Sequence, residues 1–250
     1  MFAVADLLIV AATLLLDGAV KGVVGFGLPT VVLALLTVAF GLPQAMALML
    51  ILSVVTNLWQ AGTGGHAKVI LARIWPFLLL ATLTIWFGAE ALSRVELHLL
   101  SALLGLLLIV YATVSLAGLH FSLNSRHARW AAPLFGGVNG ILTGLTGSFV
   151  VPGVMYLQAL GLPRDMLVQA MGMLFLASTL ALGVALQGQG FLTMELGGLS
   201  AAALLPALIG MWLGQRLRNR LSEAVFRRVF FAALLILGAY IIASAFGLTP

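Results

Sequence analysis

The chain has 250 residues, of which 62% are hydrophobic and only 8% are charged. Soluble globular domains carry about 25% charged residues, so this composition excludes a large water-exposed surface and indicates a polytopic integral membrane protein. The formal net charge is +5, but the basic residues are scattered through short loops, which argues against a nucleic-acid partner. The absence of cysteine excludes disulfides, thiolate nucleophiles and cysteine metal sites.

The first apolar run, Met1–Val20, has no basic region at its start and no obvious cleavage site, so we expect a retained membrane segment and not a signal peptide. Runs of about 17 to 25 apolar residues, the length that crosses a bilayer, recur along the rest of the chain. Ordinary spanning helices are expected near residues 45–61, 71–92, 97–118, 166–186, 197–214 and 224–247.

The two halves of the chain resemble each other. Gly-Leu-Pro at Gly41–Pro43 recurs at Gly161–Pro163, and Trp86-Phe87-Gly88 has a counterpart in Trp212-Leu213-Gly214. The matching segments are about 120 to 126 residues apart, as expected of an internal duplication. We therefore predict two repeats, 1–120 and 121–250, within one integral membrane domain.

Each repeat opens with a glycine-interrupted stretch, roughly 3–40 and 131–160. The apolar arms of these stretches, such as Thr30–Phe40 and Phe149–Leu160, have only about a dozen residues each, which is less than ~20 Å of helix, so we expect that neither arm spans alone. A helical hairpin that enters and leaves on the same side explains this length, although two fully spanning arms remain an alternative.

The distribution of basic residues tests this arrangement. If each opening stretch is a hairpin, the positive-inside rule places most of the arginines and lysines on the side of Arg216, leaving Lys21 in a hairpin and Arg94 outside. A single crossing by each stretch would instead place Lys68 and Arg73 opposite Arg216. The predicted fold is therefore all-α and polytopic, with two inverted repeats, each a Gly-broken hairpin followed by three transmembrane helices.

The glycine cluster of each hairpin is the first candidate site. Glycine permits a close approach of the backbone to a ligand, and a broken helix leaves N–H groups that attract anions. Pro29 and Pro152 are expected at the start of the second arms, where a missing N–H costs nothing. Paired broken helices in inverted repeats are typical of secondary transporters with a site near the midplane. Alternatively, the glycines only pack helices against each other.

Polar side chains at membrane depth are the second kind of candidate. Asp17 and Lys21 are four residues apart and would share a helix face, either as a structural ion pair or with Lys21 facing an anion while Asp17 positions it or carries a proton. The candidate substrate-binding residues are Lys21, Gly22, Gly25, Gly27, Thr30, Asn57, Asn139, Thr143, Gly144, Thr146, Gly147 and Ser148. Further polar residues that could line the same cavity are Ser53, Thr56, Gln60, Gln169 and Ser178.

Enzyme motifs are lacking. The four histidines stand near loops without the spacing of a metalloprotease, and no phosphate-binding lysine loop is present, so neither a catalytic residue, a metal nor a cofactor is expected.

The two clusters resemble the sulfite exporter TauE/SafE family, which is also grouped with toluenesulfonate uptake permeases. Members carry a Gly-rich stretch and a proline near the start of each half, then a short apolar segment and Gly-x-Pro. Here these are Gly22–Pro29 with Gly41–Pro43, and Gly140–Pro152 with Gly161–Pro163. The clusters depart from the family's consecutive glycines at Gly25-Phe26-Gly27 and at Gly147-Ser148.

The resemblance implies a carrier of the bacterial inner membrane for sulfur-containing anions such as sulfite or organosulfonates. We expect alternating access at a midplane site between the two hairpins, with a small anion and membrane lipid as partners. Protons are a candidate coupling ion and a homodimer is a candidate assembly. A non-transporting membrane scaffold or partner subunit is the alternative, and an anion channel a third possibility, disfavoured because no ring of charges is visible.

Overall fold

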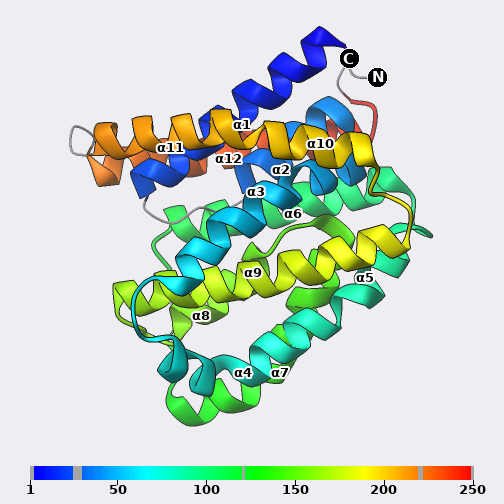
Figure 1. The fold of residues 1–250 in the computed structure, drawn as a ribbon. Helices are drawn as coiled ribbons and strands as arrows, with labels where there is room; N and C mark the ends of the chain where they lie inside the picture. Colours follow the sequence, from blue (N-terminus) through cyan, green and yellow to red (C-terminus); the bar gives the residue numbers. More distant parts are fainter. Residues whose placement is uncertain (1–2, 25–29, 120–121, 219–221, 249–250) are drawn as a thin grey trace. The chain divides into compact units, whose positions relative to one another are not determined.

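The structure is a computed structural model that describes residues 3–24, 30–119, 122–218 and 222–248. The described residues form helices joined by turns, with no strand among them (Figure 1). The expected all-α class is thereby confirmed.

The helices of the first half of the chain are α1 (Val4–Val24), α2 (Thr30–Phe40), α3 (Leu42–Gly62), α4 (Ala67–Leu83), α5 (Ile85–Leu92) and α6 (Leu97–Leu116). The second half contains α7 (Ser125–Thr146), the short π-helical segment η1 (Val150–Val154), α8 (Met155–Ala159), α9 (Arg164–Gly188), α10 (Met194–Ala202), α11 (Leu204–Arg218) and α12 (Glu223–Ala245).

Six helical spans in the described residues are long and apolar enough to cross a membrane. They are α3, α4 joined with α5, α6, α9, α10 joined with α11, and α12. Each coincides with one of the six apolar runs that predicted an ordinary spanning helix, because length and hydropathy alone determine this property.

The two opening stretches are helices with unequal arms. The first arms, α1 and α7, have 21 and 22 residues, whereas α2 has 11 and the helical segment Val150–Ala159 is similarly short. The short second arms agree with the expectation of arms of about a dozen residues, whereas the first arms are longer than expected. The long first arms have the length of a membrane-spanning helix at 1.5 Å per residue.

The glycine of each Gly-Leu-Pro motif ends a second arm. Gly41 has a φ of +84° and Gly161 a φ of +62°, in the left-handed region that side chains other than glycine's rarely adopt. The Gly41 N–H donates to Thr37 O at 3.0 Å, which closes the last turn of α2. The repeated motif is therefore a repeated helix stop.

The chain forms two compact units, which are described separately. Unit 1 comprises residues 1–52, 97–117 and 191–250, and unit 2 comprises residues 53–96 and 118–190. Each unit contains the opening stretch of one half of the chain and the second helical span of the other half, α10 with α11 in unit 1 and α4 with α5 in unit 2.

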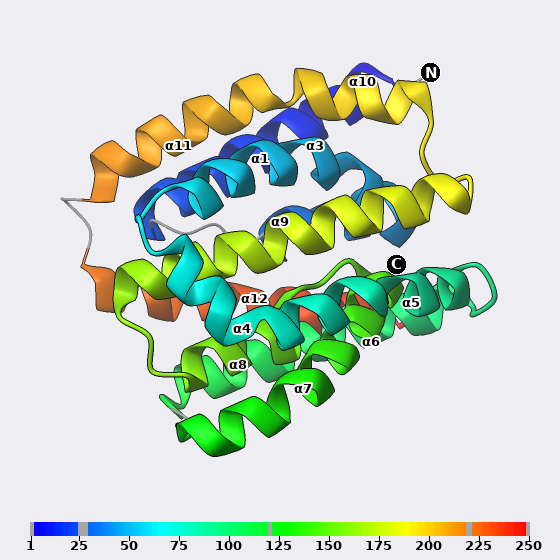
Figure 2. The ribbon, with the colours of Figure 1, turned by 60° about the horizontal axis from the view of Figure 1, so that its bottom comes forward.

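In unit 1, α1 lies along α11, as Figures 1 and 2 both show, and α12 lies along α6. Glycines make the first of these contacts. A Cβ added at Gly18 would overlap the Ala207 carbonyl oxygen, and one at Gly214 would overlap the Ala19 carbonyl oxygen. The two backbones therefore touch directly, in the way that small residues permit in membrane bundles. We call this contact the unit 1 seam.

In unit 2, α7 lies along α4 and α5 (Figure 2). A Cβ at Gly140 would lie 2.5 Å from the Ala81 carbonyl oxygen, and one at Gly144 would overlap the Ile85 carbonyl oxygen. The opposing Gly88 faces the Ile141 carbonyl oxygen in the same manner. We call this contact the unit 2 seam.

The two seams use matching residues. Gly22 faces Met211, Gly214 and Gln215, and Gly144 faces Ile85, Gly88 and Ala89. The members of the two sets follow one another at the same intervals along the chain, and Gly214 and Gly88 are the glycines of the two matching Trp-x-Gly segments. The same contact thus occurs once in each unit.

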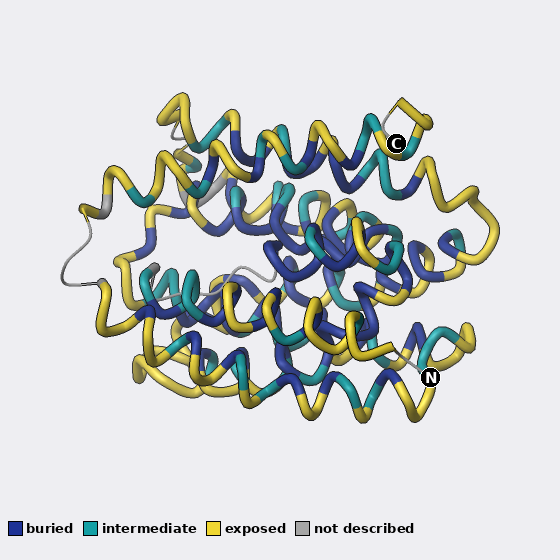
Figure 3. Tube along the Cα trace, turned by 90° about the horizontal axis from the view of Figure 1, so that it is seen from above, coloured by how far each residue is buried: buried dark blue, intermediate teal, exposed yellow. Residues whose placement is uncertain are grey.

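The burial pattern fits a bilayer. Buried and exposed positions alternate along the helices in Figure 3, and many exposed positions are large and apolar, such as Leu205 on α11 and Ile236 on α12. Exposed apolar surface on this scale is not expected in water but is ordinary in lipid.

Candidate functional site

The helix α7 ends at a sharp break in the middle of the second hairpin. Gly147 has a φ of +71° and its N–H donates to Thr143 O at 2.7 Å, so it stops the helix as a left-handed cap. The chain then continues through Ser148 and Phe149 into η1, and the Val151–Pro152 peptide bond is cis. Pro152 lies within η1, three residues before α8 begins.

Polar side chains of α7 stabilise this break. The Thr143 hydroxyl donates to Ser148 O at 3.0 Å, and the Thr146 hydroxyl accepts from Ser148 N–H at 3.2 Å. The Asn139 Oδ1 accepts from Gly153 N–H at 2.9 Å. Backbone groups that the broken helix would leave unpaired therefore find partners in the first arm.

The short second arm is fixed by an aromatic contact and an arginine. The ring of Tyr156 stacks on Phe77 of α4 with centroids 4.6 Å apart, and its hydroxyl donates to Ala128 O at 3.1 Å. Arg73 of α4 donates to Leu160 O at 2.9 Å, just beyond the end of α8. A positive charge at a helix C-terminus is favourable because of the helix dipole.

Several buried polar atoms of unit 2 have no hydrogen-bond partner. They are Asn57 Nδ2 and Oδ1, Gln60 Oε1, Asn139 Nδ2, Ser148 Oγ, Ser178 Oγ and Thr179 Oγ1. A buried polar atom without a partner costs about 1–3 kcal/mol, so such a concentration is expected only where a ligand or water completes the bonding. These six side chains are called the unit 2 polar cluster.

The six side chains come from α3, α7, α9 and the segment between α7 and η1. Gln60 Nε2 donates to Val168 O at 2.7 Å, and the Phe149 ring lies 5.6 Å from that of Phe175 on α9. Gly172, one turn before Phe175, contacts Gln60. The same face of α9 therefore meets both α3 and the residue that follows Ser148.

Gln169 has a structural role that the sequence did not reveal. Its Oε1 accepts from His66 N–H at 3.0 Å and its Nε2 donates to Ala61 O at 2.9 Å, so both ends of the amide are occupied. It joins the C-terminal end of α3 to the first turns of α9.

Thr179 was not singled out by sequence reasoning. It is 1% exposed and its hydroxyl has no partner, whereas the threonine hydroxyls at 37, 82, 84 and 146 all bond to the carbonyl four residues earlier. The signal that could have identified it is its position next to Ser178 in an otherwise apolar helix.

In unit 1, Asp17 is buried and Lys21 is half-buried, one turn apart on α1, where their charges attract each other. Gly22 lies in the unit 1 seam, facing the Met211 carbonyl oxygen. Thr30, the first residue of α2, is buried with no partner for its hydroxyl.

The predicted site residues are thus placed in different settings. Asn139, Thr143, Thr146, Gly147 and Ser148 come together at the break of the second hairpin. Gly144 and Gly22 lie in the seams, where packing accounts for them. Gly25, Gly27 and Pro29 lie outside the described residues.

No group of three His, Asp or Glu side chains that could hold a metal ion occurs in the described part of the chain. His66 and His127 are exposed. The buried polar groups of unit 2 are neutral amides and hydroxyls, which bind ligands by hydrogen bonds or through their oxygen lone pairs.

Comparison with known proteins identifies the family. No curated protein and no solved structure gave a significant match to the chain. The family model described as sulfite exporter TauE/SafE matches residues 9–241, and members of this family are membrane transporters. A match over nearly the whole chain, to a protein with six apolar spans, shows that the chain belongs to the sulfite exporter TauE/SafE family.

Proposed function

We propose that this chain is a secondary transporter that moves a small sulfur-containing anion, such as sulfite or an organosulfonate, across the inner membrane of a bacterium by alternating access. The two broken hairpins supply the groups that bind the anion. The family supports a transporter, and the chemistry of the hairpins supports an anion.

The observation that carries the anion assignment is the pair of free donors at the second hairpin. Asn139 Nδ2 and Ser148 Oγ are buried beside the break, and neither has a partner. The Asn139 amide cannot be flipped to hide its NH2 group, because its Oδ1 accepts from the Gly153 N–H. Donors held in place and removed from water bind an oxyanion strongly.

The first hairpin contributes charge. Lys21 on α1 is half-buried in a membrane helix, where a cation is costly unless it has a partner. Asp17 supplies part of that compensation, and an anionic substrate supplies the rest when it binds.

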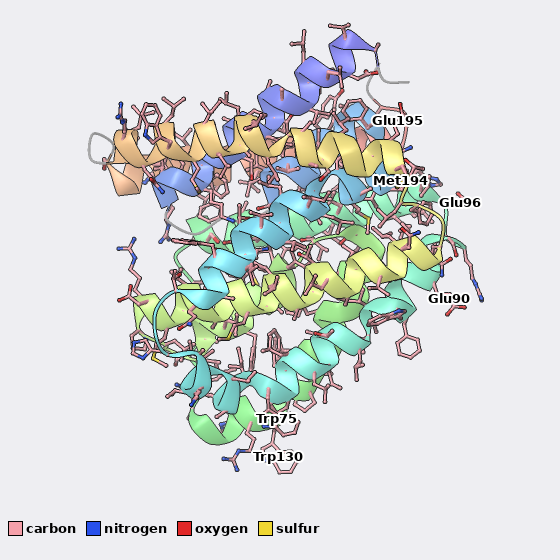
Figure 4. The ribbon with its side chains drawn as sticks, in the orientation of Figure 1. Trp75, Glu90, Glu96, Trp130, Met194 and Glu195 are labelled. Carbon is pink, nitrogen blue, oxygen red and sulfur yellow. The ribbon has the colours of Figure 1, made fainter. Side chains whose placement is uncertain are left out.

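Inverted repeats are the arrangement that we propose for the fold. The matching seams of the two units support a duplication. The lipid-facing aromatic residues support the orientation. Trp75 on α4 and Trp130 on α7 are exposed and project from the ribbon of unit 2 close to each other (Figure 4). In the sequence, Arg73 lies two residues before Trp75 and Arg129 directly before Trp130. Tryptophan gathers at membrane interfaces and arginine on the cytoplasmic side, so this end is assigned to the cytoplasm.

A flux measurement tests the proposed function. Purified protein in liposomes should take up sulfite, taurine or sulfoacetate saturably, and the Ser148→Ala variant should raise the half-saturating concentration about tenfold or more, the equivalent of one hydrogen bond to an anion. Ser93→Ala, an exposed serine of the same unit, is the matched control. No flux of any of these anions with folded protein would leave the chain a membrane scaffold.

A labelling experiment tests the inverted repeats. Single cysteines introduced at Lys68, Gln189 and Arg216 of this cysteine-free chain all occupy exposed positions. If both hairpins return to their own side, the cysteines at 68 and 216 react with an impermeant maleimide from one side and the cysteine at 189 from the other. Labelling of 68 and 216 from opposite sides would overturn this topology.

A further inference from the structure

Asp17 on α1 differs from the other acidic residues of the chain in its burial. It is 5% exposed, and among the acidic side chains that the structure describes it alone is buried. A carboxylate removed from water needs a cation beside it, or it becomes neutral by taking up a proton. The charge of Asp17 therefore depends on the groups that surround it.

The helices that pack on α1 offer few charged groups. They are chiefly α11 and α2. The α2 helix contains no ionisable side chain, and the ionisable residues of α11 are Arg216 and Arg218 at its C-terminal end. Two further arginines of unit 1, Arg227 and Arg228 on α12, are exposed.

The contacts of the unit 1 seam place these arginines far from Asp17. Successive glycines of α1 meet successive turns of α11, so the two helices run parallel, and Gly22 faces the Met211 carbonyl oxygen. Arg216 follows Met211 by five residues and Asp17 precedes Gly22 by five, which together separate the two by about 15 Å along the helix axis. Lys21, one turn from Asp17, attracts its charge and is the cation that compensates it.

Anion binding changes the charge balance of this pair. The charges of Asp17 and Lys21 cancel when nothing else is bound. A monoanion that pairs with Lys21 leaves one net negative charge at a site where Asp17 is removed from water. It also weakens the attraction that stabilises the carboxylate. A buried charge without compensation is costly, and protonation of the carboxylate removes it.

We propose that Asp17 takes up one proton each time an anion pairs with Lys21, and that this proton crosses the membrane with the anion. The inference rests on the proposed function, because it takes Lys21 as the cation that the anion meets. The proton comes from water on the side of entry and forms an O–H bond with a carboxylate oxygen of Asp17. It returns to water on the other side when the anion leaves, so a monoanion is carried without net charge.

The second hairpin adds no proton to this stoichiometry. Its seam glycines follow Asn139 and Thr143, where those of the first hairpin follow Asp17 and Lys21. An amide and a hydroxyl do not exchange a proton in this way. The carboxylates of unit 2, which are all exposed, are those of Glu90, Glu96 and Asp165. We therefore expect one proton for each anion.

Thermal unfolding in detergent tests the titration of Asp17 without a substrate. In Lys21→Thr the compensating cation is lost, so Asp17 should be charged at high pH and neutral at low pH. The double variant, Asp17→Asn with Lys21→Thr, has no group that titrates at these positions and is the matched control. The single variant should have the lower Tm at about pH 8, and this difference should shrink by at least about half at about pH 5. A difference that does not depend on pH would overturn the proposal.

The pH dependence of binding tests the linkage between proton and anion. Methanesulfonate is a suitable probe because it remains a monoanion across this pH range. Its complex should hold one more proton than the free protein, so the Kd should rise about tenfold for each pH unit from about pH 6 to about pH 8. In Asp17→Asn the Kd should be independent of pH. Calorimetric titration measures both, and a natural chain that binds with the same Kd at every pH would overturn the proposal while retaining anion binding.

Flux separates coupling from transport. With the membrane potential clamped, an inward methanesulfonate gradient should acidify the lumen of liposomes, as reported by an enclosed pH-sensitive dye. Methanesulfonic acid is too strong an acid to cross the bilayer as a neutral molecule, so the proton must move through the protein. Methanesulfonate uptake without acidification would retain the transporter and reject proton coupling. A pH-dependent Tm difference without uptake of any anion would reject both the proposed function and the coupling, and would retain only the titration of Asp17.

Discussion

Each hairpin makes the same kind of glycine seam within its own unit, but the two hairpins differ in charge. When Gly18 and Gly22 of α1 are set against Gly140 and Gly144 of α7, which make the matching contacts, Asp17 aligns with Asn139 and Lys21 with Thr143. In the second hairpin these two positions stabilise the break, through Gly153 and Ser148. In the first they form a charged pair.

This difference indicates a division of labour. A neutral amide and a hydroxyl are sufficient to hold a broken helix, so the charges of the first hairpin are not required for shape. A charged side chain at membrane depth costs free energy, and such side chains are typically functional. The predictions below separate the residues that both hairpins need for packing from those that only one uses for charge.

The seams should tolerate no side chain. Gly140→Ala places a methyl group against the Thr84 hydroxyl and 2.5 Å from the Ala81 carbonyl oxygen, and backbone cannot move aside cheaply. We expect a loss of at least about 3 kcal/mol, seen as a fall in Tm of about 6 °C or more in detergent.

The neighbouring Gly137 is the matched control. A Cβ there meets only Leu80 and Thr84 side-chain carbons at 4.0 Å, so Gly137→Ala should be neutral or stabilise α7 by about 1 kcal/mol. Equal Tm changes in the two variants would mean that the seam is not a close contact. Gly18→Ala tests the same contact in unit 1, where the Ala207 carbonyl oxygen is the obstacle.

Exchanging the charged pair for its neutral counterpart should abolish transport and preserve the fold. Replacing Asp17 by Asn and Lys21 by Thr gives the first hairpin the residues of the second. Replacing both members of a buried pair is often neutral for stability, so the Tm should change by less than about 3 °C. Anion flux into liposomes should fall at least about a hundredfold, since the cation is gone.

The single variant Lys21→Thr is the control for the double variant. It leaves Asp17 as an uncompensated buried charge, which costs about 3–5 kcal/mol, so it should be less stable than the double variant. Substantial flux in the double variant would show that the pair is structural, like its counterparts in the second hairpin.

The break of the second hairpin should depend on the oxygen of Asn139. Asn139→Leu leaves the buried Gly153 N–H without an acceptor, for a cost of about 2 kcal/mol and a fall in Tm of about 4–8 °C. Asn139→Asp retains an oxygen at this position and should recover part of the loss in a thermal unfolding measurement. If Leu and Asp behave alike, the bond to Gly153 does not stabilise the break.

Sequence reasoning succeeded where the cause is local. The six spans follow from the length and hydropathy of each run, and the helix stops at Gly41 and Gly161 follow from a motif of three residues. It named Asn139 and Ser148 as site candidates from their place in the second glycine cluster, and both lie at the break of the second hairpin, while their part in binding stays a prediction. The type of residue was sufficient for these inferences.

It fell short where the cause is a distant partner. The sequence suggested that Gly144 binds a ligand, but the structure packs it against Ile85. It suggested that Gln169 lines a cavity, but both ends of the Gln169 amide are bonded to α3 and to the loop that follows α3. Which side chains remain unpaired, as Thr179 does, depends on neighbours far away in the chain. Composition and spacing do not contain that information.

The smallest effect is expected at the end of the second hairpin. Arg73 donates to Leu160 O and so fixes the exit of α8, but the residue is exposed and its charge is screened by solvent. Arg73→Gln should cost about 1 kcal/mol and lower the Tm by about 2–4 °C. Arg94→Gln, which removes an exposed charge paired with Glu90 four residues earlier, should cost less than about 0.5 kcal/mol. If Arg73→Gln is as mild as Arg94→Gln, then the stacking of Tyr156 on Phe77 is sufficient to hold the second arm, and the arm is more rigid than its length suggests.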